Sequence, residues 1–311
     1  MNPPGFDVAV GGGGVVGAAT ARALAKRGPS VALLERGTLG RPIGSSGGGA
    51  RIWHFAGYRN DEHLDHGMHA LEGWRQLERE TNRQILLHGE GGVSYGEGVE
   101  AQAELLRRSG RECELLLGEE LNGRLPGLTL PRDEPVLFQR DAGVILSRAA
   151  LAALLASARR AGAALTEHAQ VRALTIDGPG VNVTADDDTI RADCAVVAAG
   201  PWSRQFLSMA GIDLDVHVTE QTIAGFGWKQ SPPPTLIEFG QPDPYAQFDP
   251  EVGLKAGLHE PRGIDRRSRG ALRSRARERR RAPYGVGSPA LFTRHCPSCS
   301  DEDVSLHLDT G

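Results

Sequence analysis

Three glycines and one glutamate near the N-terminus have the types and spacing of a dinucleotide site. Within residues 7–36, Gly12, Gly14 and Gly17 form Gly-x-Gly-x-x-Gly, and Glu35 follows eighteen residues after the third glycine. Such glycines let the main chain approach a pyrophosphate more closely than a Cβ would allow, and a carboxylate at that distance can accept hydrogen bonds from both ribose hydroxyls. NAD and FAD share the adenosine diphosphate half that this motif binds, so the motif leaves both open.

The motif requires a strand before the glycines, a helix after them and a second strand that ends at the acid. Residues 8–10 predict a buried parallel strand, residues 15–27 a helix that ends at Gly28, and residues 30–34 the second strand. The first turn of that helix would present its N–H groups and its dipole to the phosphates. This order of elements favours a binding site over a flexible glycine-rich loop, and it leaves Gly11 and Gly13 as spare glycines outside the motif.

Four later segments extend the α/β pattern. Apolar residues at helical spacing predict helices between residues 64 and 77 and over 148–161. Alternating residues over 170–176 and 180–184 predict two strands of a hairpin or a meander. Residues 192–200 predict a buried strand that ends on glycine and returns the chain to the parallel sheet. We therefore expect an α/β fold with both parallel and antiparallel strands.

The charge of the chain is distributed unevenly. Its 311 residues carry 35 basic and 39 acidic side chains, a net charge of −4, but residues 262–281 contain ten arginines against two acids. That segment has a net charge of +8, which leaves −12 for the remainder. No apolar run is long enough to cross a membrane and the N-terminus lacks the features of a signal peptide, so we expect a cytosolic protein. Because Cys296 and Cys299 have no second pair nearby, we assign no metal site.

Six segments together resemble the flavin amine oxidases of the monomeric sarcosine oxidase and N-methyltryptophan oxidase family, within the D-amino-acid oxidase group. They are DVAVGGGGVVG, SVALLER, GSSGGGARI, ALEGWRQLERET, AVVAAGPWS and GLKAGLH, and the likeness runs from about residue 6 to about residue 260. The resemblance implies FAD rather than NAD, bound by a Rossmann-like domain that is interleaved with an antiparallel-sheet substrate domain. We expect residues 6–82 and 145–212 in the FAD-binding domain, residues 83–144 and 213–261 in the substrate domain, and an irregular Arg-rich tail over 262–311.

The resemblance also implies which residues bind the cofactor. Ser45 and Arg51 lie in the segment that passes the pyrophosphate and the flavin ring, and Val171 resembles the residue whose backbone meets the adenine. Gly200 and Trp202 resemble the turn on the flavin side. The full set of expected cofactor-binding residues is Gly12, Gly14, Gly17, Glu35, Arg36, Ser45, Arg51, Val171, Gly200 and Trp202.

Three further residues are implied in catalysis and substrate binding. Lys255, in GLKAGLH, aligns with the lysine that these oxidases use to activate oxygen. A fixed ammonium favours the first electron transfer to oxygen because it stabilises the negative charge where water is excluded. His54 stands where the family has the arginine that binds the substrate carboxylate, and Tyr245 aligns, with one gap, as a wall of the substrate pocket. Because histidine is only partly charged at neutral pH, we expect a weaker or different carboxylate preference.

The expected activity is oxidation of the C–N bond of a secondary amine or N-methyl amino acid by O₂, which gives an imine, then an aldehyde, and H₂O₂. The cysteine that links covalently to flavin in the family, and the glycine-rich segment that closes its FAD domain, are not recognisable after Arg262. We therefore expect FAD to be bound noncovalently. We also expect a monomer that binds neither membranes nor nucleic acid. The alternative is a catalytically impaired FAD-binding remnant, and an NAD-linked dehydrogenase is less favoured.

The Arg-rich tail has three interpretations. Clustered arginines could contact phosphates of a nucleic acid or another anionic surface. They could equally form a solvated extension, the usual fate of a charge run. The abrupt change of composition after GLKAGLHEP favours a third interpretation, coding sequence read out of frame, with a disordered extension next.

Overall fold

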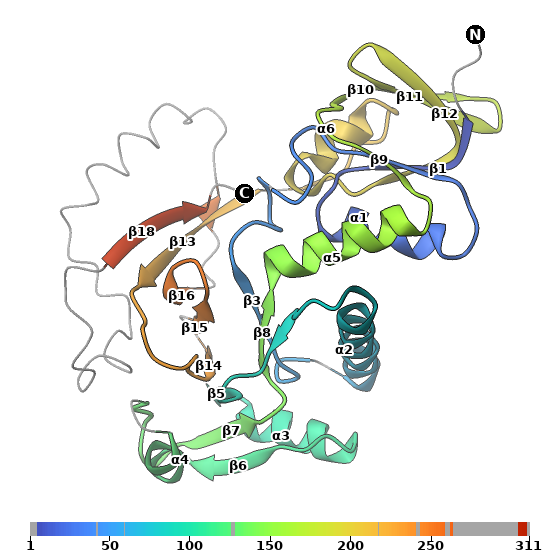
Figure 1. The fold of residues 1–311 in the computed structure, drawn as a ribbon. Helices are drawn as coiled ribbons and strands as arrows, with labels where there is room; N and C mark the ends of the chain where they lie inside the picture. Colours follow the sequence, from blue (N-terminus) through green and yellow to red (C-terminus); the bar gives the residue numbers. More distant parts are fainter. Residues whose placement is uncertain are drawn as a thin grey trace.

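The computed structural model describes residues 5–41, 43–58, 60–125, 128–216, 218–240, 243–258, 262–263 and 304–309. These residues form a sheet with a parallel core, a large mostly antiparallel sheet, and a small sheet between them (Figure 1). Within these ranges, no helix combines the length and the apolar character that a membrane span requires.

The first sheet has six strands in the order β10-β11-β12-β1-β2-β9. Its parallel core consists of β1 (Gly5–Gly11), β2 (Val31–Leu34), β9 (Ala164–Thr166) and β12 (Asp188–Val197), and its antiparallel edge of β10 (Val171–Asp177) and β11 (Gly180–Ala185). Val8 pairs with Val31 on one side and with Cys194 on the other, so β1 is the central strand. The predicted return of the chain through residues 192–200 is thus the strand that lies beside the glycine motif.

Alternating side chains of β1 pack on opposite faces of this sheet. Val8 and Val10 face α1 (Val15–Ala25) and α5 (Ser147–Arg160), whereas Ala9 packs with Phe206 of α6 (Ser203–Ser208). A fourth helix, α2 (Asp61–Thr81), lies against α5 on the side away from the sheet (Figure 1). The predicted helices over 15–27, 64–77 and 148–161 are therefore confirmed, and helical packing covers the sheet on both faces.

The second sheet has nine strands, in the order β17-β13-β16-β15-β14-β5-β7-β6, with β18 paired to β13. Its strands are β5 (Gly92–Gly96), β6 (Glu114–Leu117), β7 (Pro135–Gln139), β13 (Thr219–Phe226), β14 (Thr235–Phe239), β15 (Pro244–Asp249), β16 (Gly253–Leu258), β17 (Arg262–Gly263) and β18 (Val304–Asp309). Only the β5–β14 pair is parallel. One face carries apolar residues such as Val93, Phe138 and Leu254, which pack against Leu121 of α4 (Gly118–Arg124).

A three-stranded sheet of β3 (Ala50–Trp53), β8 (Gly143–Leu146) and β4 (Leu86–Leu87) joins the two larger sheets (Figure 1). The helix α3 (Val99–Arg108) packs with Trp53 and Leu86 in the core beneath it. Strand β15 contacts both β3 and β8. Strand β3, which follows the glycine-rich residues 44–49, therefore lies against the second sheet.

The expected fold class, a parallel sheet combined with an antiparallel one, is confirmed. Residues 5–34 and 164–208 build the first sheet with its covering α6, and residues 92–139 and 219–258 build most of the second. The precise domain boundaries stay a prediction. The expected irregular tail falls mainly on residues 264–303, which lie outside the described residues, while β17 and β18 are the strands described within it.

Candidate cofactor site

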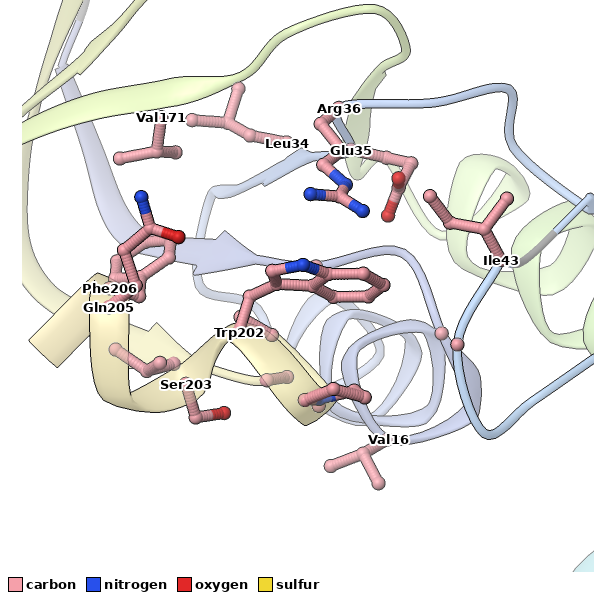
Figure 2. A pocket seen from close by; sticks show the side chains of 18 of the residues that line it. Val16, Leu34, Glu35, Arg36, Ile43, Val171, Trp202, Ser203, Gln205 and Phe206 are labelled. Carbon is pink, nitrogen blue, oxygen red and sulfur yellow. The ribbon is translucent and has the colours of Figure 1, made fainter. Parts of the chain in front are cut away.

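A cavity of about 430 Å³ lies at the carboxyl ends of β1, β2 and β12, where the glycine loop enters α1 (Figure 2). It is lined by residues 12, 14–16, 34–36, 43–46, 169–171, 197–203, 205, 206 and 209. In open sheets with a parallel core, ligands bind in the crevice outside the carboxyl ends of the strands. The cavity therefore occupies the position at which the glycine motif predicts a dinucleotide.

Two glycines of the motif, Gly12 and Gly17, have a clear steric reason for their identity. Gly12 has a φ of +114°, and a Cβ on it would lie 2.4 Å from the carbonyl oxygen of Ala198. A Cβ on Gly17 would lie 1.9 Å from the carbonyl oxygen of Gly12, so the helix can approach the loop only without a side chain. A Cβ on Gly14 would lie 3.1 Å from Ser46 Oγ. The loop is thus packed between β12 and α1 in one shape.

The two glycines outside the motif, Gly11 and Gly13, are also closely packed. A Cβ on Gly11 would lie 2.4 Å from the ring of Phe206, and one on Gly13 would lie 2.8 Å from Leu39 and 3.0 Å from Glu35. Both contacts are made by side chains distant in the sequence. No spacing rule for the motif contains them.

The N-terminus of α1, the positive end of its dipole, faces the cavity. Gly14 is its N-cap and offers no side chain, and the first turn of the helix contains no acidic residue. Ser46 Oγ accepts a hydrogen bond from the N–H of Val15, at 3.0 Å. A helix end of this kind attracts phosphate oxygens. Ser46 was missed by sequence reasoning, which chose its neighbour Ser45, because nothing in the run Gly-Ser-Ser distinguishes the two serines.

The carboxylate of Glu35 braces the glycine loop. Its Oε2 accepts from the N–H of Gly13 and its Oε1 accepts from the N–H of Gly37, both at 2.7 Å. Each oxygen keeps acceptor capacity for a further hydrogen bond. Contacts to two ribose hydroxyls would therefore add to these backbone bonds rather than replace them.

Arg36 and Trp202 stack across the cavity. The guanidinium carbon of Arg36 lies 3.6 Å from the centroid of the Trp202 ring, a close cation–π contact. Figure 2 shows this pair with Glu35 and Ile43 on one side and Val171 with Phe206 on the other. The stack joins the end of β2 to the turn after β12, which are separated in the sequence by more than 160 residues. Cation and indole together form one wall of the site.

Eight of the ten expected cofactor residues line the cavity, and two do not. Those that line it are Gly12, Gly14, Glu35, Arg36, Ser45, Val171, Gly200 and Trp202. Gly17 lies beneath the loop, where it packs against Gly12. Arg51 holds the shape of residues 45–50 instead, since its guanidinium donates to the carbonyls of Ser45 at 2.8 Å, Gly47 at 2.5 Å and Ala50 at 2.8 Å.

Lys255 is buried in the second sheet, with 5% of its surface exposed. Its Nζ donates to the carbonyl oxygen of Ala50 at 3.3 Å and lies 3.6 Å from Oδ2 of Asp249. Sequence reasoning found the lysine through the resemblance and missed the aspartate. The lysine ammonium therefore contacts the segment that leads from the cavity into β3.

The other two expected active-site residues lie toward the same face of this sheet. Tyr245 pairs with Gly257, whose lack of a side chain gives room to the phenol: a Cβ there would lie 2.7 Å from the Tyr245 hydroxyl oxygen. Since residues two apart on a strand share a face, Tyr245 and Lys255 point the same way. His54 follows β3, and both its Cε1 and the ring of Phe239 lie 3.6 Å from the Cβ position of Gly57.

That face of the second sheet also carries the buried polar side chains that sequence reasoning missed. They are Ser94, Gln139, Thr235, Gln247 and Asp249, each 4% exposed or less. Gln139 Oε1 accepts from the N–H of Ala56 at 3.0 Å and so fixes the loop that holds His54. Alternation in PYAQFD, with Tyr245, Gln247 and Asp249 on one face, was the signal that could have found two of them.

Among the described residues, no group of three histidine, cysteine or acidic side chains is arranged to bind a metal ion. Cys113 and Cys194 are free thiols. Cys296 and Cys299 lie outside the described residues, so their pairing and any metal binding stay untested.

Comparison with known proteins gives consistent matches. A sequence model of the family described as "FAD dependent oxidoreductase" (DAO) matches residues 7–277. The monomeric sarcosine oxidase of Bacillus sp. (strain B-0618) is 28% identical over 240 residues, which are 75% of this chain and 61% of that protein. The peroxisomal sarcosine oxidase of Homo sapiens is 33% identical over 220 residues, 68% of this chain and 55% of that protein. The chain thus spans about 55–61% of the length of these curated relatives.

The structure superposes on that of NikD, described as an unusual amino acid oxidase essential for nikkomycin biosynthesis, with a TM-score of 0.73 and 30% identity. The match covers 84% of this chain and 72% of NikD. The resemblance to the sarcosine oxidase family that the sequence segments indicate is confirmed by these comparisons.

Proposed function

This chain belongs to the FAD dependent oxidoreductase family, and from that premise we propose that it is an FAD-dependent amine oxidase. The proposed substrate is a secondary amine or an N-methyl amino acid, with sarcosine as the reference compound, and the proposed oxidant is O₂. The names of the relatives support this substrate class, because two of them are sarcosine oxidases.

The observation that carries the proposal is the cavity at the carboxyl ends of β1 and β2. Its volume, its glycine-lined floor and the N-terminus of α1 fit the adenosine diphosphate part of FAD. Gly12, Gly14 and the first-turn N–H groups would hold the pyrophosphate, and Glu35 would hold the ribose. Val171 and the Arg36–Trp202 stack would form the walls.

The reaction balances with one amine, one O₂ and one water. The amine loses two electrons and two protons to give an imine, water adds to the imine to release an aldehyde and the demethylated amine, and O₂ gains two electrons and two protons to give H₂O₂. FAD, when bound, supplies the redox centre that carries the two electrons between the amine and oxygen. The side chains of the protein would therefore position the amine and stabilise the charge that develops on oxygen.

Lys255 is the residue proposed to act on oxygen. Its ammonium is removed from solvent, and a fixed positive charge in such surroundings stabilises negative charge that develops on oxygen more strongly than it would in water. Tyr245 and His54 are proposed to bind the amine substrate.

The replacement of an arginine by His54 has a testable consequence for the substrate carboxylate. A guanidinium binds a carboxylate through two parallel hydrogen bonds and stays charged, whereas an imidazole does neither at neutral pH. We expect a high KM for sarcosine, and we expect His54→Arg to lower it by about tenfold. A wild-type KM in the range of the family, unchanged by His54→Arg, would refute this role for His54.

The overall proposal is tested by purifying the full chain with excess FAD and assaying H₂O₂ release with sarcosine, N-methyltryptophan and proline. A yellow protein that releases peroxide supports the oxidase. Yellow protein without turnover of any amine supports the alternative, an impaired FAD-binding remnant. A folded but colourless protein overturns both, and enhanced nicotinamide fluorescence on titration with NADH would then indicate a nicotinamide enzyme.

The oligomeric state and the location of the protein complete the proposal. We propose a cytosolic monomer without a nucleic-acid partner. Light scattering coupled to gel filtration and fractionation of the native host would test the two properties separately.

A further inference from the structure

We propose that Asp249 is a positioning residue for Lys255, which holds the lysine ammonium and the loop of residues 44–51 together in one arrangement. The inference rests on the proposed function to the extent that Lys255 acts on oxygen. Its structural part, the fixing of the loop by a buried carboxylate, does not depend on any substrate.

Asp249 lies at the end of β15, with 2% of its surface exposed. Its Oδ2 accepts from the N–H of Gly49 at 3.2 Å and from the N–H of Ala50 at 3.0 Å, and it lies 3.6 Å from Lys255 Nζ. Its Oδ1 accepts from the N–H of Glu251 at 2.9 Å. Three backbone N–H groups and one ammonium thus compensate a carboxylate that is removed from solvent, as a buried charge requires.

The carbonyl side of the same peptide is held as well. The oxygen of Ala50 accepts from Gln247 Nε2 at 2.9 Å and from Lys255 Nζ at 3.3 Å, in addition to its contact with Arg51. Two residues of β15 and one of β16 therefore bind the start of β3 through its N–H and C=O groups. These partners are about 200 residues away in the sequence.

Gly49 is what admits the carboxylate. A Cβ on Gly49 would lie 2.1 Å from Oδ1 of Asp249 and 2.9 Å from its carboxyl carbon. The backbone of the loop and the carboxylate can therefore approach only where residue 49 has no side chain. The contact therefore requires both Gly49 on the loop and Asp249 on the sheet.

The loop that Asp249 holds also forms part of the cavity. Gly44, Ser45 and Ser46 line the cavity, and Ser46 caps the first helical N–H of α1. Arg51 ties the carbonyls of Ser45 and Gly47 to the start of β3. The contacts run continuously from the helix end at the cofactor site, through residues 46–50, to the Lys255 ammonium.

The negative charge of Asp249 also stabilises the positive charge of the Lys255 ammonium. A Cβ position on Gly48 lies 3.3 Å from Arg51 Nη1 and 3.7 Å from Lys255 Nζ, so two cations lie close to each other, and the Asp249 carboxylate lies 3.6 Å from the Lys255 ammonium. When one partner of a buried ion pair is removed, the other is left as an uncompensated charge. Without the carboxylate the ammonium would be disfavoured or would turn toward another acceptor. Asp249 therefore supports the charge that Lys255 is proposed to bring to oxygen.

The test uses the full chain loaded with FAD and the variant Asp249→Asn, which keeps the shape of the side chain and removes its charge. The enzyme is reduced with dithionite, so no amine substrate is needed, and its reoxidation by O₂ is followed by stopped-flow absorbance. We expect the second-order rate constant for O₂ to fall at least about tenfold, with the flavin content unchanged. Anaerobic reduction by an amine substrate should change by less than about threefold. The matched control is Asp187→Asn, an exposed carboxylate in the turn between β11 and β12, which should alter neither rate.

A second measurement tests the inference without FAD. It also applies if Asp249→Asn reacts slowly with O₂ because the whole fold is perturbed. Hydrogen exchange of peptides within residues 44–53 is compared between wild type and Asp249→Ala, and we expect at least about tenfold faster exchange in the variant. An unchanged O₂ rate in Asp249→Asn, or equal losses in both half-reactions, would overturn the positioning of Lys255. Unchanged exchange would overturn the fixing of the loop. Absence of FAD in the wild type would refute the proposed function alone, because the exchange experiment needs no cofactor.

Discussion

Glu80, near the end of α2, joins three helices that support the cofactor site. Its Oε2 accepts from Arg22 of α1 at 2.8 Å and from the Ser157 hydroxyl of α5 at 3.2 Å. Its Oε1 accepts from Lys26, also a basic residue beside α1. The helix that carries the glycine motif is thus bound to α2 and α5 through one carboxylate. We expect Glu80→Gln to destabilise the folded chain measurably.

The magnitude follows from the carboxyl group's titration. The hydrogen bond from Lys26, with further contributions from Arg22, lowers the pKa of Glu80 from 4.5 to about 2, although burial opposes the shift. Such a shift corresponds to about 3 kcal/mol at neutral pH. The Glu80 side chain is 24% exposed and Lys26 is 40% exposed, so solvent screens part of the interaction. We expect Glu80→Gln to lower the free energy of unfolding by about 2 kcal/mol at pH 7.

The assay is urea unfolding monitored by circular dichroism, at a series of pH values from 7 to 3. A carboxyl group with a lowered pKa in the folded state stabilises fully above its unfolded pKa of 4.5, and this contribution declines as the pH falls toward about 2. The difference between wild type and Glu80→Gln should therefore be largest near pH 7 and should shrink below pH 4.5. The matched control is Glu72→Gln on the same helix. Glu72 forms an ion pair with Arg79 at 2.6 Å, but the Glu72 side chain is 62% exposed. That change should cost less than about 0.5 kcal/mol. Equal effects of the two substitutions, or a Glu80 effect independent of pH, would refute the reasoning.

Two further substitutions test the loop and the second sheet. Gly17→Ala should weaken FAD binding at least about tenfold in a flavin fluorescence titration, because the new methyl group would displace the Gly12 carbonyl, whereas Gly73→Ala, where a Cβ meets nothing within 4 Å, should leave binding unchanged. Equal affinities for the two variants would contradict the packing described for the loop. Burial and a hydrogen bond to Glu238 at 2.8 Å raise the pKa of Tyr95 above its ordinary value of 10, so its stabilisation should be present below pH 10 and decline above it. Tyr95→Phe should reduce that alkaline dependence in unfolding curves, and an unaltered dependence would exclude Tyr95 as its source.

The cofactor half of the protein could be predicted from its sequence because its determinants are local. The strand, glycine loop, helix and second strand of residues 5–36 follow one another without insertion, and each has its own periodicity or turn signal. The helix predicted over 148–161 lies at 147–160, since one apolar face specifies it. The strand predicted over 192–200 begins earlier, at Asp188, because pairing with β11 extends it beyond its apolar part.

Contacts that connect distant segments could not be predicted in the same way. The Arg36–Trp202 stack and the Ser46 cap of α1 depend on how two loops meet, which neither loop encodes alone. The alternation in PYAQFD places Asp249 on one face of a strand, but its contact with Gly49, which makes it a buried anion, has no signal in either segment alone. Sequence reasoning recovered Lys255 only through the resemblance to a family, not from any local signal.

One face of the second sheet buries polar side chains, which an interior that serves stability alone does not require. Along β15, Ala246 packs in an apolar core, while Gln247 and Asp249 on the opposite face are buried as well, each with 2% of its surface exposed. Well-packed apolar side chains of similar volume would usually be as stable as a buried ion pair or more so, and they need no matched partners. Departures from an apolar interior are expected where a site needs fixed charges and hydrogen bonds. Gln247 and Asp249 lie on the strand that carries Tyr245, beside the strand of Lys255. They contact Gly49 and Ala50, which follow the cavity-lining residues 43–46. The buried Lys255–Asp249 pair thus fixes one ammonium in place on this face, as the role proposed for Lys255 requires.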